Sequence, residues 1–298
     1  MIEISEKEIS EKEKRGNSDM NNNTNYNMNP PETSSPEGRR FAEKIGAAMY
    51  TVHKSVAQDM YAAFQALADM GYRAVEFYGE PEFDIETVRK SLEQSGLILS
   101  GWHTEWRNLQ EDRFAQTVEY LHQVNCPLAV VPCLGGKWRI AHGPEEECRE
   151  IWLRYIEQMN LLSEKLGSEG IRMGYHNHDH EFRLAYDGKQ VFDLLFDGLS
   201  EKIIMEFDSG NCIEGGADPL RVLEKYRDRE KILHLKPYSH TNGFNTVLHA
   251  PDDANDWETI LHPPGKEYLW MLIESENEVL PELDNAKQCM EGFREIAK

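Results

Sequence analysis

Residues 171–179 read IRMGYHNHD, and this stretch carries the pattern that decides the fold. Its apolar first part, 171–176, is typical of a buried strand, and polar side chains of ligand type follow at once. Seven further apolar runs of this kind lie between residue 44 and the C-terminus, separated by segments of helical period. The expected strands are 45–51, 74–78, 98–103, 128–132, 171–176, 203–208, 232–236 and 269–274.

The segments between these runs carry helix signals. Met60, Phe64 and Leu67 follow helical spacing, and Gly71 suits the left-handed position that ends a helix. Asp218 followed by Pro219 predicts an N-cap with proline at the first helical position. Further helices are expected from 84, over 114–124 and 145–166, from 256, and over 280–297.

Eight strands alternating with about eight helices predict one α/β domain, a (β/α)8 TIM barrel over residues 42–298. No strand is followed by G-x-G-x-x-G or a P-loop motif, so nucleotide-binding folds lose their usual support. Residues 1–41 are charged, then rich in asparagine and proline, and are expected to form a disordered tail. In a TIM barrel, catalytic groups lie at the carboxyl ends of the strands.

Composition narrows the partners. The 53 acidic and 32 basic residues give a net charge of −21, which disfavours nucleic acid. No apolar run reaches the ~18 residues of a membrane span, and the N-terminus has no signal-like apolar region. The five cysteines lack C-x-x-C spacing and indicate reduced thiols, so a cytoplasmic location is expected, and a homo-oligomer is compatible with the sequence.

The carboxyl ends of the predicted strands collect residues that bind metals. His176 and His178 point to one face of their strand, because side chains alternate. Asp208 ends the sixth run as a ligand or a helix cap. His234 is a ligand or a hydrogen-bonded core histidine, and Glu274, which closes an apolar run, is costly to bury unless paired or metal-bound. Imidazoles and carboxylates together suit divalent transition metals.

Other strand-end residues have two interpretations each. His103, flanked by Trp102 and Trp106, either contacts a substrate or is merely covered by the tryptophans. Lys236 is either a salt-bridge partner or an electrophile that steadies an enediolate. Glu76 and Glu276 also follow strands. Expected surface or loop residues are His180, Glu181, His240 and His249, and Asp252 and Asp253 are expected to be solvated loop charges or to lie over the site.

Several motifs together resemble the sugar phosphate isomerase/epimerase family with the xylose-isomerase-like barrel. The resemblance covers residues ~44–298 in the correct order. The motifs are KIG with MYTV (44–46, 49–52), MGY with AVE (70–72, 74–76), GYHNHDHEF (174–182), GADP (216–219), HLK (234–236), NDW (255–257) and IESE (273–276).

The resemblance implies a metal site on the last four strands, formed here by His176, Asp208, His234 and Glu274. Many members carry glutamate at the position of His176, where it forms an acid/base pair with the glutamate of the last strand. Related barrels with such substitutions act on 3-keto-glycosides by elimination. The family also usually has aspartate after the lysine of the seventh strand, where this chain has Pro237.

The leading hypothesis is a divalent-metal-dependent sugar isomerase or epimerase that acts on a keto sugar through an enediolate. Manganese is the expected metal, with zinc, cobalt, iron and magnesium as alternatives. Glu274, His176 or His178 would be the base and Lys236 the electrophile. The residues expected to bind the sugar, which carries no phosphate, are His103, Glu76, Trp106 and Glu276.

Three rival hypotheses stay open. The first is a metal-dependent lyase or hydrolase that cleaves 3-keto-glycosides by β-elimination, and release of the aglycone would distinguish it. The second is a sugar-binding protein without turnover, since fold does not imply function. The third, a metal-dependent DNA-repair nuclease on a similar barrel, is disfavoured by the net charge of −21.

Overall fold

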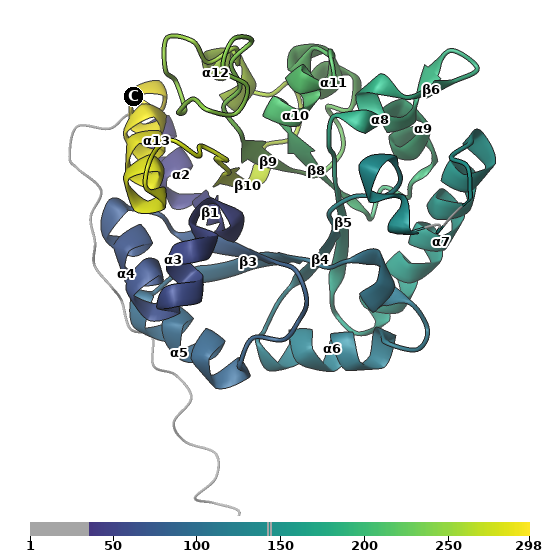
Figure 1. The fold of residues 1–298 in the computed structure, drawn as a ribbon, viewed down its shortest axis with the longest axis horizontal. Helices are drawn as coiled ribbons and strands as arrows, with labels where there is room; N and C mark the ends of the chain where they lie inside the picture. Colours follow the sequence, from purple (N-terminus) through teal and green to yellow (C-terminus); the bar gives the residue numbers. More distant parts are fainter. Residues whose placement is uncertain (1–35, 142, 144) are drawn as a thin grey trace, which may run out of the picture. The chain divides into compact units, whose positions relative to one another are not determined.

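Eight parallel strands close into a barrel in the computed structural model, which describes residues 36–141, 143 and 145–298. The first strand pairs with the last, which closes the sheet (Figure 1). This confirms the predicted (β/α)8 barrel. The strands in barrel order are β1 (Ile45–Ala48), β2 (Ala74–Tyr78), β3 (Ile98–His103), β4 (Leu128–Val131), β5 (Arg172–His176), β8 (Ile204–Asp208), β9 (Lys231–Leu235) and β10 (Tyr268–Ile273).

Helices surround the strands (Figure 1). The N-cap predicted at Asp218 is confirmed, because its carboxylate accepts a hydrogen bond from the Leu220 N–H. Asp84 and Asp256, where helices were expected to start, cap their helices in the same way. Gly71 ends α4 with a φ of 99°, as predicted. The longer helices are α2 (Pro36–Glu43), α4 (Met60–Met70), α5 (Ile85–Ser95), α6 (Phe114–Gln123), α7 (Arg149–Ser168), α9 (Val191–Gly198), α11 (Pro219–Lys225) and α13 (Glu282–Ile296).

The structure differs from the prediction at two places. The first strand ends at Ala48 rather than at 51, because the chain turns into the 3-10 helix η1 (Met49–Val52). The Thr51 hydroxyl donates to the Ile273 carbonyl at 3.3 Å and fixes this turn. Between β5 and β8 the chain adds α8 (His180–Arg183), the hairpin β6 (Ala185–Tyr186) and β7 (Lys189–Gln190), and α9, none of which the sequence had indicated.

The remaining short helices connect the other elements. They are α3 (His53–Gln58), α10 (Ser209–Glu214) and α12 (Trp257–Leu261) and the 3-10 helices η2 (Trp106–Leu109) and η3 (Gly136–Ala141).

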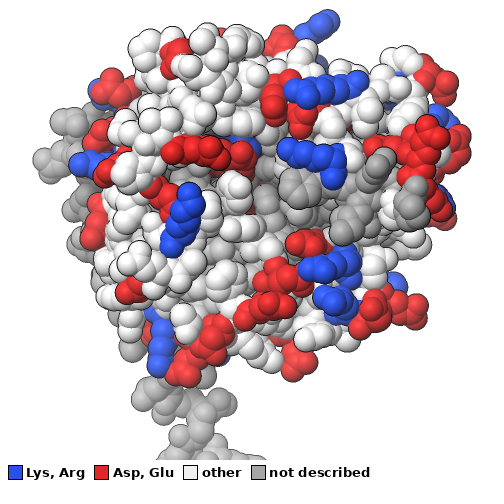
Figure 2. Space-filling view, viewed as in Figure 1, with Lys and Arg blue, Asp and Glu red and all other residues white. Residues whose placement is uncertain are grey.

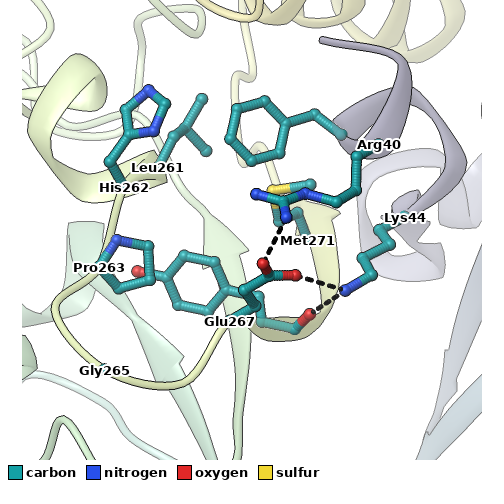
Figure 3. A pocket seen from close by; sticks show the side chains of 10 residues that line it. Arg40, Lys44, Leu261, His262, Pro263, Gly265, Glu267 and Met271 are labelled. Carbon is teal, nitrogen blue, oxygen red and sulfur yellow. Dashed lines mark hydrogen bonds and ion pairs between the residues drawn. The ribbon is translucent and has the colours of Figure 1, made fainter. Parts of the chain in front are cut away.

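The predicted tail, 1–41, lies outside the described residues as far as residue 35. Residues 36–41 belong to α2 and are helical, and the Phe41 side chain is packed in the core. Arg40 and Lys44 converge on Glu267 (Figure 3), at the edge of a cavity of about 220 Å³. This cavity lies beside Tyr268, at the amino end of β10, and so at the opposite end of the barrel from the expected chemistry.

The barrel interior is apolar at its amino end and ionisable at its carboxyl end. Its apolar end, called the floor below, consists of Leu128, Val130, Ile204, Ile232 and Leu272, which form a cluster of their own. Because side chains alternate along a strand, the next residues on the same face are two positions further on. These residues are Glu206 on β8, His234 on β9 and Glu274 directly after β10.

The described surface mixes both signs of charge. On the face shown in Figure 2, basic side chains lie among acidic ones and form no continuous stripe. None of the helices within the described residues is long and apolar enough to cross a membrane.

Candidate metal and catalytic site

Four predicted metal ligands meet at the carboxyl ends of their strands. His176, Asp208, His234 and Glu274 each offer one ligand atom, and these atoms lie within 4.8 Å of one another. All four residues are buried. Their positions follow from the parallel strands, which end on one rim of the barrel.

Asp208 serves as a helix cap and also faces the other candidates. Its Oδ1 accepts a hydrogen bond from the Asn211 N–H at 2.7 Å at the start of α10. Its backbone N–H donates to Asn177 Oδ1 at 3.0 Å, which ties β8 to the end of β5. Its Oδ2 is buried without a hydrogen-bond partner and lies 3.9 Å from both His176 Nε2 and Lys236 Nζ. The two interpretations of Asp208 are therefore compatible, one for each oxygen.

Glu274 and Lys236 form a buried ion pair on the same rim. Lys236 Nζ lies 2.9 Å from Glu274 Oε1 and 2.5 Å from Glu276 Oε1. The same nitrogen lies over the Phe244 ring, 4.6 Å from the ring centroid. Burial alone would lower the pKa of Lys236, but the charges of Glu274 and Asp208 raise it well above its usual range. Lys236 is therefore a fixed cation beside the candidate ligands.

A second layer of ionisable side chains lies between the rim and the apolar floor. Glu206 Oε1 is 2.6 Å from His103 Nε2, 3.1 Å from His234 Nε2 and 3.2 Å from His176 Nδ1. Glu76 Oε2 is 3.1 Å from His103 Nε2 and 2.9 Å from His234 Nε2. Both carboxylates are almost completely shielded from solvent. Glu76, expected to bind a substrate, thus lies among the imidazoles.

Charge differs among the imidazoles. Burial alone would lower the pKa of His103, but Glu76 and Glu206 raise it to about 10. Burial lowers the pKa of His176 well below its usual value, and the charges of His234 and His103 lower it further. Burial and then the charge of Lys236 do the same to His178. At neutral pH, His176 and His178 are therefore neutral bases, whereas His103 is a cation.

Glu206 and Glu181 are the buried carboxylates that the sequence analysis missed or misplaced. Glu206 stands inside an otherwise apolar run, and its cost of burial was the signal that could have found it. The prediction that Glu181 and His180 are surface residues is wrong, since both are buried. Glu181 accepts hydrogen bonds from the Tyr175 hydroxyl at 2.5 Å and from the His178 N–H at 2.9 Å. It therefore fixes the turn that carries His178.

The remaining predicted residues lie around this centre or away from it. Glu276 is partly exposed at the rim beside Lys236. Trp106 is buried against Tyr155 of α7, with ring centroids 5.5 Å apart. Asp253 accepts from Tyr238 N–H and from the Trp257 indole, so it organises the loop after β9 rather than acting as a solvated charge. His240 and His249 are exposed, as predicted.

The donor set fits a divalent cation. The carboxylates of Glu76, Glu206, Asp208 and Glu274 face the cations Lys236 and His103 and also His234, whose pKa the carboxylates of Glu206, Glu274 and Glu76 raise. These three positive charges leave one buried carboxylate charge, which is costly unless a metal cation or a proton neutralises it. Mixed imidazole and carboxylate donors are those of divalent transition metals. The unpartnered Oδ2 of Asp208 supplies an acceptor that faces the remaining ligands.

Comparison with known proteins decides the family. A family model described as xylose isomerase-like TIM barrel matches residues 64–296. The chain belongs to this family. The resemblance found in the sequence is thereby confirmed.

Proteins similar to this chain are named for several different activities. An inosose dehydratase of Geobacillus kaustophilus is 26% identical over 189 residues, 58% of this chain, and the chain spans only 60% of that relative's length. A solved sugar phosphate isomerase/epimerase from Parabacteroides distasonis has a TM-score of 0.70 at 20% identity, covering 90% of this chain and 100% of its own. A D-allulose 3-epimerase from Methylomonas sp. has a TM-score of 0.58 at 12% identity, covering 85% and 97%. These two structures show the shared fold.

Proposed function

We propose that this protein is a divalent-metal-dependent isomerase or epimerase that acts on an unphosphorylated keto sugar through an enediolate. The observation that carries the proposal is the meeting of His176, Asp208, His234 and Glu274 beside a buried cation, Lys236. Isomerisation of a keto sugar requires removal of a proton from the carbon beside the carbonyl. As this proton leaves, negative charge develops on the carbonyl oxygen. The names of the related epimerases support this class of reaction.

The four buried residues of the rim would hold the metal, and manganese is the ion we favour. A divalent ion bound there supplies Lewis-acid polarisation of the substrate oxygens. Lys236 is held as a cation by Glu274 and Glu276, so it can donate a hydrogen bond to an oxygen that becomes anionic. It cannot act as a base, because its pKa is raised.

His178 is the residue that we propose as the base. The side chains of His176 and Glu274 are committed to the ligand set, whereas His178 lies two residues further along the chain and is partly exposed. Its imidazole ring lies 5.1 Å from that of His176. Since its pKa is lowered, the imidazole is neutral at pH 7 and can take the proton and return it to the neighbouring carbon, which isomerises the sugar. Epimerisation would need a second residue to supply a proton on the opposite face of the enediolate.

The sugar would enter between the rim residues. His103 is a cation with a partly exposed side chain, and Glu276 is partly exposed beside Lys236. Both can bind hydroxyl groups of a sugar, His103 as a donor and Glu276 as an acceptor. Lys236 is already paired with two carboxylates, which leaves it poorly suited to a phosphate group. We further propose that residues 42–298 form one domain and that the protein acts in the cytoplasm.

A second candidate function is β-elimination from a keto-cyclitol or a 3-keto-glycoside. Two observations favour it: the curated relatives named above are inosose dehydratases, and His176 stands where an acid/base pair would need a carboxylate. The first step is the same, because His178 removes the α-proton. The electron pair then expels the group on the β-carbon, which takes up a proton and leaves as water or as the aglycone alcohol.

One experiment tests the proposal and separates the two reactions. The manganese-loaded protein is incubated in D2O with D-fructose and, separately, with an inosose, and proton NMR follows exchange at the α-carbon. We expect exchange with a ketohexose together with a new epimer or aldose. Exchange followed by loss of water would replace isomerisation with elimination. Binding without any exchange would contradict both and favour the sugar-binding protein.

A further inference from the structure

We propose that Glu206 is a positioning residue whose single carboxylate sets two metal-binding imidazoles in opposite tautomers. The inference rests on the proposed metal site, which it deepens. Metal-bound histidines usually donate the N–H of their other ring nitrogen to a carboxylate or carbonyl, and this contact fixes the ring. Here one carboxylate would do so for His176 and His234 together.

The geometry of Glu206 is that of a shared acceptor. Its Oε1 lies within 3.2 Å of His103 Nε2, His176 Nδ1 and His234 Nε2, so three imidazole nitrogens converge on one oxygen. Glu206 is completely buried inside the barrel, on the same face of β8 as the floor residue Ile204. A carboxylate oxygen can only accept, so nitrogens that hydrogen-bond to it must carry protons.

The two ligands meet this oxygen through different nitrogens. His176 donates from Nδ1, which leaves Nε2 facing Asp208 Oδ2 at 3.9 Å. His234 turns Nε2 toward Glu206 Oε1, at 3.1 Å, and toward Glu76 Oε2, at 2.9 Å, and its Nδ1 lies 2.6 Å from Glu274 Oε2. Because Nδ1 also faces a carboxylate, it carries a proton that a metal bound at the rim would displace. The nitrogens that face the rim carboxylates are the ones available to a metal. His176 would therefore hold the metal through Nε2 and His234 would hold it through Nδ1.

Glu76 has a smaller part in the same arrangement. Its Oε2 accepts from His234 Nε2 at 2.9 Å and lies 3.1 Å from His103 Nε2. Glu76 thus contacts one proposed ligand, whereas Glu206 contacts two. Loss of the Glu206 charge should weaken metal binding more than loss of the Glu76 charge.

A competing arrangement makes the inference testable. His103, His176, Glu206 and His234 also offer one ligand atom each within 4.8 Å of one another. In that deeper set, however, Glu206 Oε1 already occupies the position on which the three imidazole nitrogens converge. A metal bound there would use Nδ1 of His176 and Nε2 of His234, which reverses both assignments.

The first test uses the unmodified protein. Protein labelled with 15N-histidine is loaded with Zn²⁺, and long-range proton–nitrogen NMR spectra identify the metal-bound and protonated nitrogens of each ring; His176→Gln and His234→Gln variants assign the signals. We expect a metal-bound Nε2 in His176 and a metal-bound Nδ1 in His234. The reversed pattern, or the same nitrogen in both rings, would overturn the inference. Wild-type protein that binds no Zn²⁺ would overturn the metal site itself, which is a separate result.

The second test measures Zn²⁺ affinity by competition with a chelator. Glu206→Gln should weaken binding by about 10- to 100-fold, the usual effect of removing an outer-shell partner, and Glu76→Gln by less. Glu181→Gln is the matched control, because Glu181 is equally buried but its hydrogen bonds go to Tyr175 and the backbone of His178. Unchanged affinity in folded Glu206→Gln, or an equal loss in Glu181→Gln, would contradict the inference.

Discussion

Two buried lysines lie near opposite ends of strand β9, and they differ in their partners and in the direction of their pKa shifts. Lys231, at the amino end, donates hydrogen bonds to the backbone carbonyls of Arg227 and Arg229 at 2.8 and 2.9 Å. Lys236, just past the carboxyl end, faces Glu274, Glu276 and Asp208. Burial lowers the pKa of Lys231 to about 8, whereas carboxylates raise that of Lys236.

The difference shows how the barrel divides its two ends between stability and chemistry. At the amino end a buried charge meets only neutral acceptors, so the protein tolerates it at a cost. At the carboxyl end compensating carboxylates keep the charge and place it beside the candidate ligands. In TIM barrels, active sites occupy the carboxyl face, while the other face contributes to stability. The following predictions test this division, from the largest expected effect to the smallest.

Replacement of the proposed base should have the largest effect on turnover. His178→Ala should lower kcat by about 10²- to 10⁴-fold, the usual contribution of a general base, and leave metal content unchanged. Steady-state kinetics with the substrate found in the exchange experiment, together with elemental analysis, measures both. His249→Ala is the control, since His249 is exposed on a loop. Wild-type rates in His178→Ala would exclude this residue as the base.

The two lysines of β9 should separate in kinetics. Lys236→Met should lower kcat by about 10²- to 10³-fold, as when one preorganised donor to a developing oxyanion is lost. Lys231→Met should leave kcat unchanged, because its partners are backbone carbonyls at the opposite end of the strand. Equal losses of kcat in both folded variants would contradict the division between the two ends.

The floor should affect stability and not metal binding. Ile204→Ala removes a buried side chain from the apolar cluster of the barrel and should lower the free energy of unfolding by about 2–5 kcal/mol. Denaturant titration measures this loss. Metal affinity should stay within about threefold of the wild-type value, because Ile204 lies two residues before Glu206 and contributes no donor atom. A large loss of affinity would show that floor and site are coupled.

Metal affinity should fall as the pH decreases below neutral. Burial, and after it the charge of Glu274, raises the pKa of Asp208 to about 7, although Lys236 opposes the shift. A proton on Asp208 competes with the metal, so affinity should decrease by about tenfold per pH unit below 7 from this group and level off above it. Calorimetric titrations with Mn²⁺ between pH 5.5 and 8 test the slope. A constant affinity over this range would contradict the proposed role of Asp208 as a ligand.

The sequence predicted what depends on local pattern. Apolar runs located all eight strands, and Asp84, Asp218 and Asp256 marked helix starts, because an N-cap is a contact between near neighbours. The predicted barrel placed His176, Asp208, His234 and Glu274 on one rim, and the resemblance to the family selected them as metal ligands. The 3-10 turn after Ala48 was missed, since it depends on a contact between Thr51 and the distant residue Ile273.

The second layer of the site was harder to predict. Glu206 and Glu76 each interrupt an apolar strand, but their partners come from other strands, and only the closed barrel brings these together. Glu181 was assigned to the surface or a loop. Its burial depends on Tyr175 and on the short helix α8, which no periodic pattern announced.

The measurement that tests the central claim most directly is elemental analysis of the purified protein beside Asp208→Ala. Asp218→Ala, which also loses an aspartate N-cap but lies on the surface, controls for the lost cap. We predict nearly one divalent metal ion per chain in the wild type and in Asp218→Ala, and almost none in Asp208→Ala. A wild-type protein that contains no metal and fails to bind added Mn²⁺ would contradict the metal site and the function derived from it.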